Sequence, residues 1–232
     1  MRTRIRRLRA RAAAASIDFP LPTRALAELF PGAEWLEVTL LPRLLRRHEW
    51  AMPESELAVL GALCRALQPR SIVEFGTFTG GSTLMMAANT PPQARIITVD
   101  LDPSTRAAHR DGLGTGIGGF EVGELFRESA YANKIEQRYA NTQEFDATSL
   151  AGSVDFLFLD GDHTYDFVRS DTDKALRMLR PGGTLLWHDY TWGPEHVECA
   201  GVTRCVNEFW RQHGGCFRIA DTRFAIHLDA RA

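Results

Sequence analysis

The sequence predicts an α/β fold built on one mostly parallel, seven-stranded sheet, with helices on both faces and a C-terminal antiparallel hairpin. From residue 71 onward, short β-branched or apolar runs alternate with helical stretches, which is typical of parallel strands joined by crossover helices. The last two apolar runs, Cys216–Ala220 and Phe224–Leu228, are separated by only three residues, as in a hairpin. A chain of 232 residues is long enough to bury such a core.

The strands and helices are assigned from these runs in chain order. A helix at Glu54–Leu67 has apolar residues at the 3.6-residue period and ends before Pro69. Helices are also expected at Gly80–Asn89, Tyr165–Leu179 and about Gly201–His213. The parallel strands are expected at Ser71–Phe75, Arg95–Asp100, about Lys134–Tyr139, Val154–Asp160 and, after the Pro181-Gly182-Gly183 turn, Thr184–His188.

The chain is predicted to divide into an N-terminal extension, residues 1–52, and a core domain, residues 53–232. The extension joins an arginine-rich tail to short amphipathic pieces between prolines, which we interpret as a basic tail and a helical segment that is a candidate lid. No apolar run is long enough to span a bilayer, so we expect a cytoplasmic protein without membrane contact. The net charge of −2 gives no general attraction to nucleic acid, and a homo-oligomer is left open.

A glycine-rich segment follows the first strand of the core domain and opens a helix. Gly76 permits a tight turn, and the N–H groups at the helix start can receive an anionic or polar group. The G-x-x-x-G spacing differs from the dinucleotide pattern, and Glu74 suits a cationic ligand. A G-x-G-x-x-G string at Gly114, Gly116 and Gly119 follows no apolar strand and is read as a loop.

Acidic residues follow several of the predicted strands. Asp100 lies twenty residues after Gly80, where a carboxylate can accept both hydroxyls of a ribose. Asp160 and Asp189 each end a central strand, on the side where open α/β sheets bind ligands. The order of these residues indicates a nucleoside-containing cofactor, and the last two carboxylates could hold a divalent ion.

Five parts of the sequence form a recurring pattern: Val73–Thr83, Asp100, Phe156–His163, Leu179–Gly183 and Trp187–Tyr190. Together they resemble bacterial class I S-adenosylmethionine (SAM)-dependent O-methyltransferases. The closest pattern is that of the sugar, macrolide and cephalosporin-hydroxylase-like groups, with catechol O-methyltransferase more distant. The resemblance covers about residues 53–228 and implies a Rossmann-like fold with SAM as cofactor. The implied cofactor contacts are Glu74, Gly76, Thr77, Phe78, Gly80, Ser82, Asp100, Asn141, Thr142 and Asp160.

The resemblance also implies a base and a metal site. The family's general base is an Asp or a His just beyond the fourth strand, which here gives His163 first and Asp162 second. The implied metal ligands are Asp160, His188 and Asp189. The family has an acid at the His188 position, and since magnesium prefers oxygen while imidazole suits transition metals, magnesium and a transition metal both stay open.

These features predict methyl transfer from SAM to a hydroxyl of a small molecule, a sugar or a specialised metabolite. No Asn-Pro-Pro-Tyr string, typical of enzymes that methylate amino groups, follows the fourth strand. The alternatives are a non-methylating, hydroxylase-associated member of the same fold, a SAM-binding protein without turnover and a dinucleotide oxidoreductase. Fold analogy does not identify the acceptor.

Overall fold

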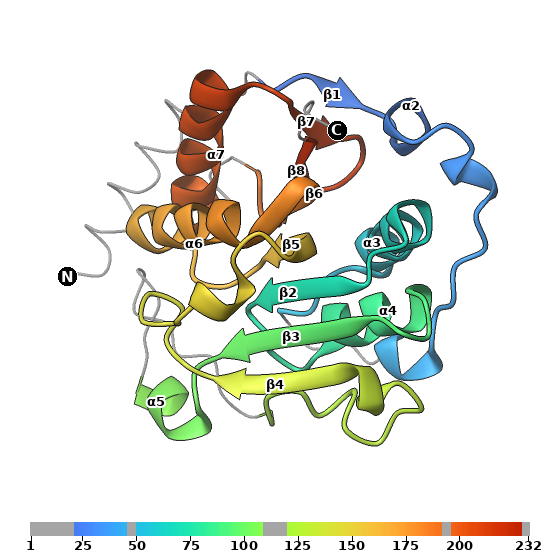
Figure 1. Ribbon diagram of the computed structural model, residues 1–232, viewed down its shortest axis with the longest axis vertical. Helices are drawn as coiled ribbons and strands as arrows, with labels where there is room; N and C mark the ends of the chain where they lie inside the picture. Colours follow the sequence, from blue (N-terminus) through green and yellow to red (C-terminus); the bar gives the residue numbers. More distant parts are fainter. Residues whose placement is uncertain (1–20, 46–49, 109–119, 192–195, 229–232) are drawn as a thin grey trace.

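The computed structural model of the chain describes residues 21–45, 50–108, 120–191 and 196–228. Two features from the sequence lie outside these residues, the arginine-rich tail and the G-x-G-x-x-G string. Figure 1 shows the described part as one sheet with helices packed around it.

Eight strands form this sheet within the described residues. They are β1 (Thr23–Arg24), β2 (Ser71–Phe75), β3 (Arg95–Asp100), β4 (Ile135–Tyr139), β5 (Val154–Leu159), β6 (Leu179–Trp187), β7 (Cys216–Ile219) and β8 (Ala225–Leu228). Their order is β1-β7-β8-β6-β5-β2-β3-β4. Pairs among β2 to β6 are parallel, as is β1 with β7, whereas β8 runs antiparallel to both β6 and β7. The predicted parallel sheet with a C-terminal hairpin is therefore confirmed.

Six α-helices and five short 3-10 helices connect these strands in the described part of the chain. The α-helices are α2 (Leu26–Leu29), α3 (Glu54–Leu67), α4 (Gly81–Asn89), α5 (Pro103–Ala108), α6 (Tyr165–Met178) and α7 (Ala200–His213). The 3-10 helices are Ala33–Trp35, Pro42–Leu45, Ala132–Lys134, Thr148–Leu150 and Val197–Cys199. None of these helices is both long and apolar enough to cross a lipid bilayer.

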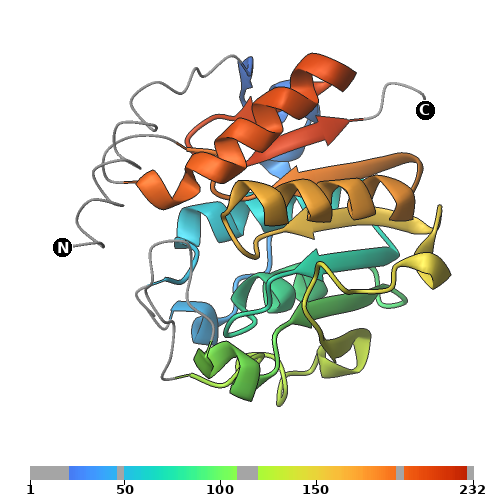
Figure 2. The same ribbon diagram turned by 90° about the vertical axis from the view of Figure 1, so that its left-hand side faces the viewer.

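Helices cover both faces of the sheet, as Figures 1 and 2 show. Val73 and Phe75 of β2 belong to a buried core with side chains of α6 and α7. Ile72, the neighbour of Val73, belongs to a second core with Leu60 of α3 and Met86 of α4. Because successive side chains of a strand point to opposite faces, apolar residues at consecutive positions of β2 serve both cores.

The sheet has one strand more than the predicted seven. Thr23 and Arg24 of the N-terminal extension form β1, which pairs with Arg218 and Ile219 of β7. A two-residue strand is too short to show an alternating pattern, so its sequence gives no strand signal. Its formation depends on the edge of β7, whose backbone groups need a partner.

The predicted turn at Pro181–Gly183 lies inside β6 and does not precede it. Leu179 pairs with Val154 of β5, and the next pair joins Thr184 to Phe156, so the register shifts between them. Extra residues on one strand bulge outward while the ladder continues on both sides, and a glycine turn accommodates this bulge. The turn and the strand are therefore compatible.

The sheet order places the loops after β2 and β5 at a switch point. From β2 the chain continues to β3 and β4 on one side, and it then returns to β5 on the other side. Open α/β sheets bind ligands outside the carboxyl ends of the strands at such a point. The amide of Asp160, just after β5, donates to the carbonyl oxygen of Phe75 at 2.8 Å, so the two strand ends meet.

Candidate active site

The loop after β2 turns tightly against the end of β5. Gly76 and Gly80 have left-handed backbone conformations, with φ of +98° and +86°. A Cβ atom at Gly76 would lie 2.0 Å from the backbone oxygen of Asp160. Only glycine, which has no Cβ atom, avoids this clash. The turn leads to the amino end of α4, and the N–H groups at the start of a helix can bind anionic or polar ligands.

Asp100 holds this loop in place. Its Oδ2 atom accepts hydrogen bonds from the amides of Thr77 at 3.0 Å and Phe78 at 2.8 Å, and its Oδ1 atom accepts from the amide of Leu101 at 2.8 Å. The side chain is buried at the carboxyl end of β3. Asp100 thus orders the predicted cofactor loop, and its contact with a ribose stays a prediction.

Replacing Asp100 with alanine is expected to weaken SAM binding by about tenfold or more, because each charge-assisted hydrogen bond contributes roughly 1.5–3 kcal/mol. Isothermal titration calorimetry measures the affinity. Asp102→Ala is the matched control, because this exposed carboxylate bonds only to Ser104 and Thr105 in the contacts described and caps α5. Equal SAM affinity in Asp100→Ala and the wild type would contradict the role of Asp100.

Glu74 and Ser82 lie inside the protein. Glu74 is fully buried, and its carboxylate accepts hydrogen bonds from the hydroxyls of Ser82 at 2.5 Å, Thr83, and Thr98 at 2.7 Å. Burial raises the pKa of Glu74 to about 7, although the three hydroxyls oppose the shift. The carboxylate ties β2 to α4 and β3, and it makes these contacts where the sequence suggested a cationic ligand.

The predicted adenine-binding residues follow β4 at the same edge of the sheet. The Oδ1 atom of Asn141 accepts from the amide of Gln143 at 3.0 Å and forms a local turn. The hydroxyl of Thr142 donates to Asp171 of α6 at 3.1 Å. Both side chains are half-buried, and their contact with adenine stays a prediction.

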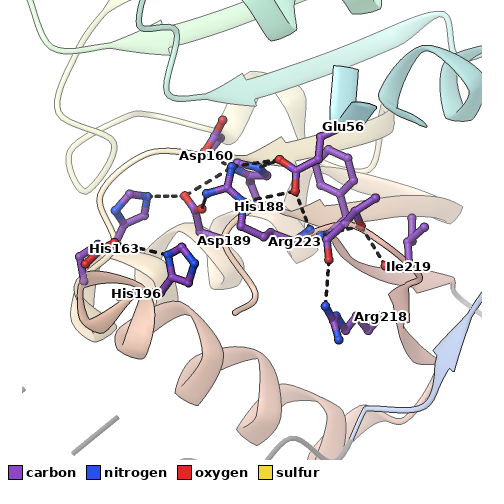
Figure 3. A network of polar contacts seen from close by, with 12 residues as sticks. Glu56, Asp160, His163, His188, Asp189, His196, Arg218, Ile219 and Arg223 are labelled. Carbon is purple, nitrogen blue, oxygen red and sulfur yellow. Dashed lines mark hydrogen bonds and ion pairs between the residues drawn. The ribbon is translucent and has the colours of Figure 1, made fainter. Parts of the chain in front are cut away.

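Four side chains from the ends of β5 and β6 converge beside the cofactor loop (Figure 3). The Nε2 atom of His163 lies 2.8 Å from Asp189 Oδ2. The Nδ1 atom of His188 lies 3.0 Å from Asp160 Oδ1 and 3.3 Å from Asp189 Oδ2. The structure therefore brings together the residues predicted as base and as metal ligands.

Glu56 and Arg223 complete this cluster and were not predicted from the sequence. Glu56, in the first turn of α3, places Oε2 2.9 Å from His188 Nε2. Arg223, just before β8, donates from Nη1 to Asp189 Oδ1 at 2.7 Å and from Nη2 to Glu56 Oε2 at 3.0 Å. A charged residue four positions before Leu60, on the buried face of the helix, is the sequence signal that could have revealed Glu56.

The charges of the cluster shift its pKa values in opposite directions. Burial disfavours the charged form of His163, but the carboxylate of Asp189 outweighs it and raises the pKa of His163 to about 9. The same balance, with Asp189 and Asp160 as partners, raises the pKa of His188 well above its usual value. Burial of Asp189 is outweighed by the two histidines, which hold its pKa well below the usual range. At neutral pH, imidazolium and carboxylate groups are therefore paired.

Asp162 stabilises a local turn through its side chain, whereas Asp189 has a left-handed backbone conformation. The Oδ1 atom of Asp162 accepts from the amide of Thr164 at 2.7 Å and stabilises the turn that precedes α6. Asp189 has a φ of +56°, a conformation that is uncommon for residues other than glycine and is found at functional sites. Because Asp162 bonds to the turn and His163 contacts Asp189, the geometry favours His163 over Asp162 as the base, and both assignments stay predictions.

One group of side chains in the described part of the chain could hold a metal ion. Asp160, His163 and Asp189 each offer one ligand atom, and these atoms lie within 4.8 Å of one another. The group contains His163 in place of the predicted His188, whose two ring nitrogens face carboxylates.

Comparison with known proteins connects this site to a family. The family profile described as "Methyltransferase domain" matches residues 73–190, just over half of the chain. The chain belongs to this methyltransferase family. The methyltransferase match includes the cofactor loop, His163 and Asp189, whereas Glu56 and Arg223 lie outside the matched range.

The chain is also similar in sequence to individual proteins. Tricin synthase 1 of Oryza sativa subsp. japonica is 26% identical over 170 residues, 68% of this methyltransferase chain and 65% of that protein. Catechol O-methyltransferase B of Danio rerio is 32% identical over 169 residues, 71% of this chain and 57% of that protein. The chain thus spans between about half and two thirds of the length of these relatives.

A solved structure shows the shared fold. The O-methyltransferase TomG from Streptomyces achromogenes, in complex with SAM, has a TM-score of 0.61 and 18% identity, with 87% of this chain and 96% of that chain covered. The similarity confirms the Rossmann-like methyltransferase fold that the sequence predicted.

Proposed function

We propose that the protein is a SAM-dependent O-methyltransferase that acts on a hydroxyl of a small molecule. The contact between the cofactor loop and the charged cluster carries this proposal. Gly76 packs against the backbone of Asp160, and the side chain of Asp160 contacts His188 in the cluster. The loop expected to hold the cofactor and the side chains expected to activate the acceptor are thus one continuous site. Family membership supports the same reaction.

The loop residues fit SAM. The left-handed glycines bring backbone close to a ligand, α4 begins directly after the turn, and the Asp100 carboxylate lies at the end of the neighbouring strand. Bound SAM would supply an electrophilic methyl group on a sulfonium. The residues that would hold it are Gly76, Thr77, Phe78, Gly80, Asp100, Asn141, Thr142 and Asp160. The other two predicted contacts, Glu74 and Ser82, are buried and hydrogen-bonded to each other, and we propose that they support the loop from inside.

The chain's own residues prepare the acceptor. The ring of His163 is 35% exposed, so a hydroxyl can reach it, whereas Asp189 behind it is 8% exposed. In the neutral ring, Nε2–H donates to Asp189, and Nδ1 accepts the proton of the hydroxyl. The Asp189 carboxylate then stabilises the imidazolium, and the deprotonated oxygen is the nucleophile for the methyl group.

Incubation with SAM and a panel of acceptors tests the function through formation of S-adenosylhomocysteine (SAH). The panel pairs sugars with aromatic diols, since the name of one relative gives catechol as an acceptor. We expect SAH and a methylated product in equal amounts with at least one acceptor. SAM binding without SAH would favour a binding protein or a non-methylating member of the fold. Thermal stabilisation by NAD but not by SAM would favour a dinucleotide oxidoreductase.

We also propose that a divalent metal binds at Asp160, His163 and Asp189. Two carboxylates and an imidazole suit a transition metal better than magnesium, so the donor set fits a metal of this kind. Such an ion would lower the pKa of a bound hydroxyl. His163 cannot ligate it through the same nitrogen and act freely as a base, so metal binding and simple base catalysis predict different behaviour.

Chelation is expected to abolish SAH formation, and an added divalent ion is expected to restore it. Co²⁺ absorption spectra give a readout that does not depend on activity. If His163 is a ligand, His163→Ala weakens Co²⁺ binding, whereas His188→Ala retains it. If instead His188→Ala weakens Co²⁺ binding and His163→Ala retains it, the ligands are Asp160, His188 and Asp189, as predicted from the sequence. Full activity in chelator, with no Co²⁺ spectrum, would exclude the metal and leave His163 as a base alone.

We infer that residues 1–52 are an extension and residues 53–232 the catalytic domain. Leu21 and Leu44 of the extension are buried against the rest of the protein. The proposed acceptor is a small molecule and not a nucleic acid, since the net charge is −2. A cytoplasmic location and a homo-oligomer fit this function.

A further inference from the structure

We propose that Glu56 is a positioning residue for methyl transfer, and that it acts with Arg223 to orient His188 and Asp189. The inference rests on the proposed function and adds a residue that lies outside the matched methyltransferase range. Figure 3 shows Glu56 reaching the cluster from α3, on the side away from His163.

Every oxygen of the Glu56 carboxylate has two partners. The Oε1 atom accepts from the backbone amide of Arg223 at 2.7 Å and from its Nε at 3.2 Å. The Oε2 atom accepts from Arg223 Nη2 at 3.0 Å and lies 2.9 Å from His188 Nε2. Glu56 is only 4% exposed, and a buried carboxylate is retained at such a position only where cations and donors surround it.

The contact with Glu56 fixes the ring of His188. With Nε2 directed at Glu56, the opposite nitrogen Nδ1 faces Asp160 and Asp189. The rings of Phe158 and Phe224 lie beside the imidazole, with centroids 6.4 Å and 5.3 Å away, and offer no polar partner. A carboxylate behind an imidazole sets the orientation of the ring and the nitrogen that carries its proton.

Glu56 also acts on Asp189 through Arg223, which contacts both carboxylates. Its Nη1 binds Asp189 Oδ1 at 2.7 Å, which leaves Asp189 Oδ2 for His163 at 2.8 Å. Glu56 holds the guanidinium by its other two nitrogens, so the planar fork has one fixed direction. Through Arg223, Glu56 therefore constrains both oxygens of Asp189.

Glu56→Gln keeps the size of the side chain and removes its charge, so it is the main test variant. We expect turnover to fall by about 10- to 100-fold, the usual loss for such supporting residues, with SAM affinity unchanged. The ¹⁵N resonances of the His188 ring should lose the signature of an Nε2–H bound to a carboxylate. Glu136→Gln is the matched control, because Glu136 also pairs with an arginine, Arg138, but is 60% exposed on β4; it should behave as the wild type.

Glu56→Asp serves as a second variant if Glu56→Gln does not fold, which circular dichroism shows. Restored charge at a shorter reach should recover part of the turnover. Unchanged turnover and unchanged His188 resonances in Glu56→Gln would overturn the inference. A wild-type protein that forms no SAH would overturn the proposed function instead, and the resonances of His188 would still decide whether Glu56 fixes the ring.

Discussion

Replacing His163 with alanine is expected to lower turnover by about 10²- to 10⁴-fold, the usual contribution of a general base, while SAM affinity stays unchanged. The half-buried ring of His163 belongs to the charged cluster. The cofactor loop is held by Asp100 and not by His163, so the loss of the ring leaves SAM binding unchanged. Rates of SAH formation and calorimetry measure the two quantities. His213→Ala, an exposed histidine at the far end of α7, is the matched control. Wild-type turnover in His163→Ala would contradict its role.

The pH dependence of the wild type follows from the same residue. Because Asp189 outweighs burial and raises the pKa of His163 to about 9, the ring is protonated at neutral pH and cannot accept a proton. If His163 acts as the base without a metal ion, we expect kcat/KM to rise about tenfold per pH unit below that value and to level off above it. A rate independent of pH in this range would show that His163 is not the base of the metal-free enzyme.

Replacing Asp189 with asparagine is expected to reduce both activity and the free energy of unfolding. Asp189 is buried and contacts His163, His188 and Arg223, and breaking a buried ion pair on one side costs about 3–5 kcal/mol. Asparagine also removes the charge that raises the pKa of His163, so the midpoint of the pH–rate profile should move to lower pH. Urea unfolding measures the free energy, and Asp166→Asn, exposed in the first turn of α6, is the control.

The pH dependence of this stability difference has a definite sign. The folded-state pKa of Asp189 lies well below 3.8, its ordinary value, so its charge stabilises the native state above that value. The contribution is lost as the pH falls through the lowered pKa. The wild type and Asp189→Asn should therefore differ fully at pH 7 and converge in strong acid. A constant difference across this range would mean that the charge of Asp189 does not stabilise the fold.

The carboxylate of Glu74 has its hydrogen-bond partners inside the protein. Its place before Gly76 indicated a residue beside a cationic ligand, yet the carboxylate is fully buried among three hydroxyls. Neighbours of Glu74 on β2 face helices on both sides of the sheet, so a polar side chain on this strand must find its partners inside. Those partners come from α4 and β3, and no spacing in the sequence identifies them.

The sequence by itself determined the succession of strands and helices, the glycine turn after β2 and the acids at the strand ends. These features are local, because side-chain periodicity and the freedom of Gly76 to adopt a positive φ act within a few residues. Only the tertiary structure decided that β1 joins the sheet and that Glu56 meets Arg223, which lies 167 positions away. It also decided that His163 joins the two acids at the candidate metal site, and that His188 contacts the same acids through Nδ1 and Glu56 through Nε2. Such contacts depend on which distant segments of the chain come together in the folded protein. Because a charge that is buried without a partner is costly, the charged residues at such a site must pair for the chain to fold.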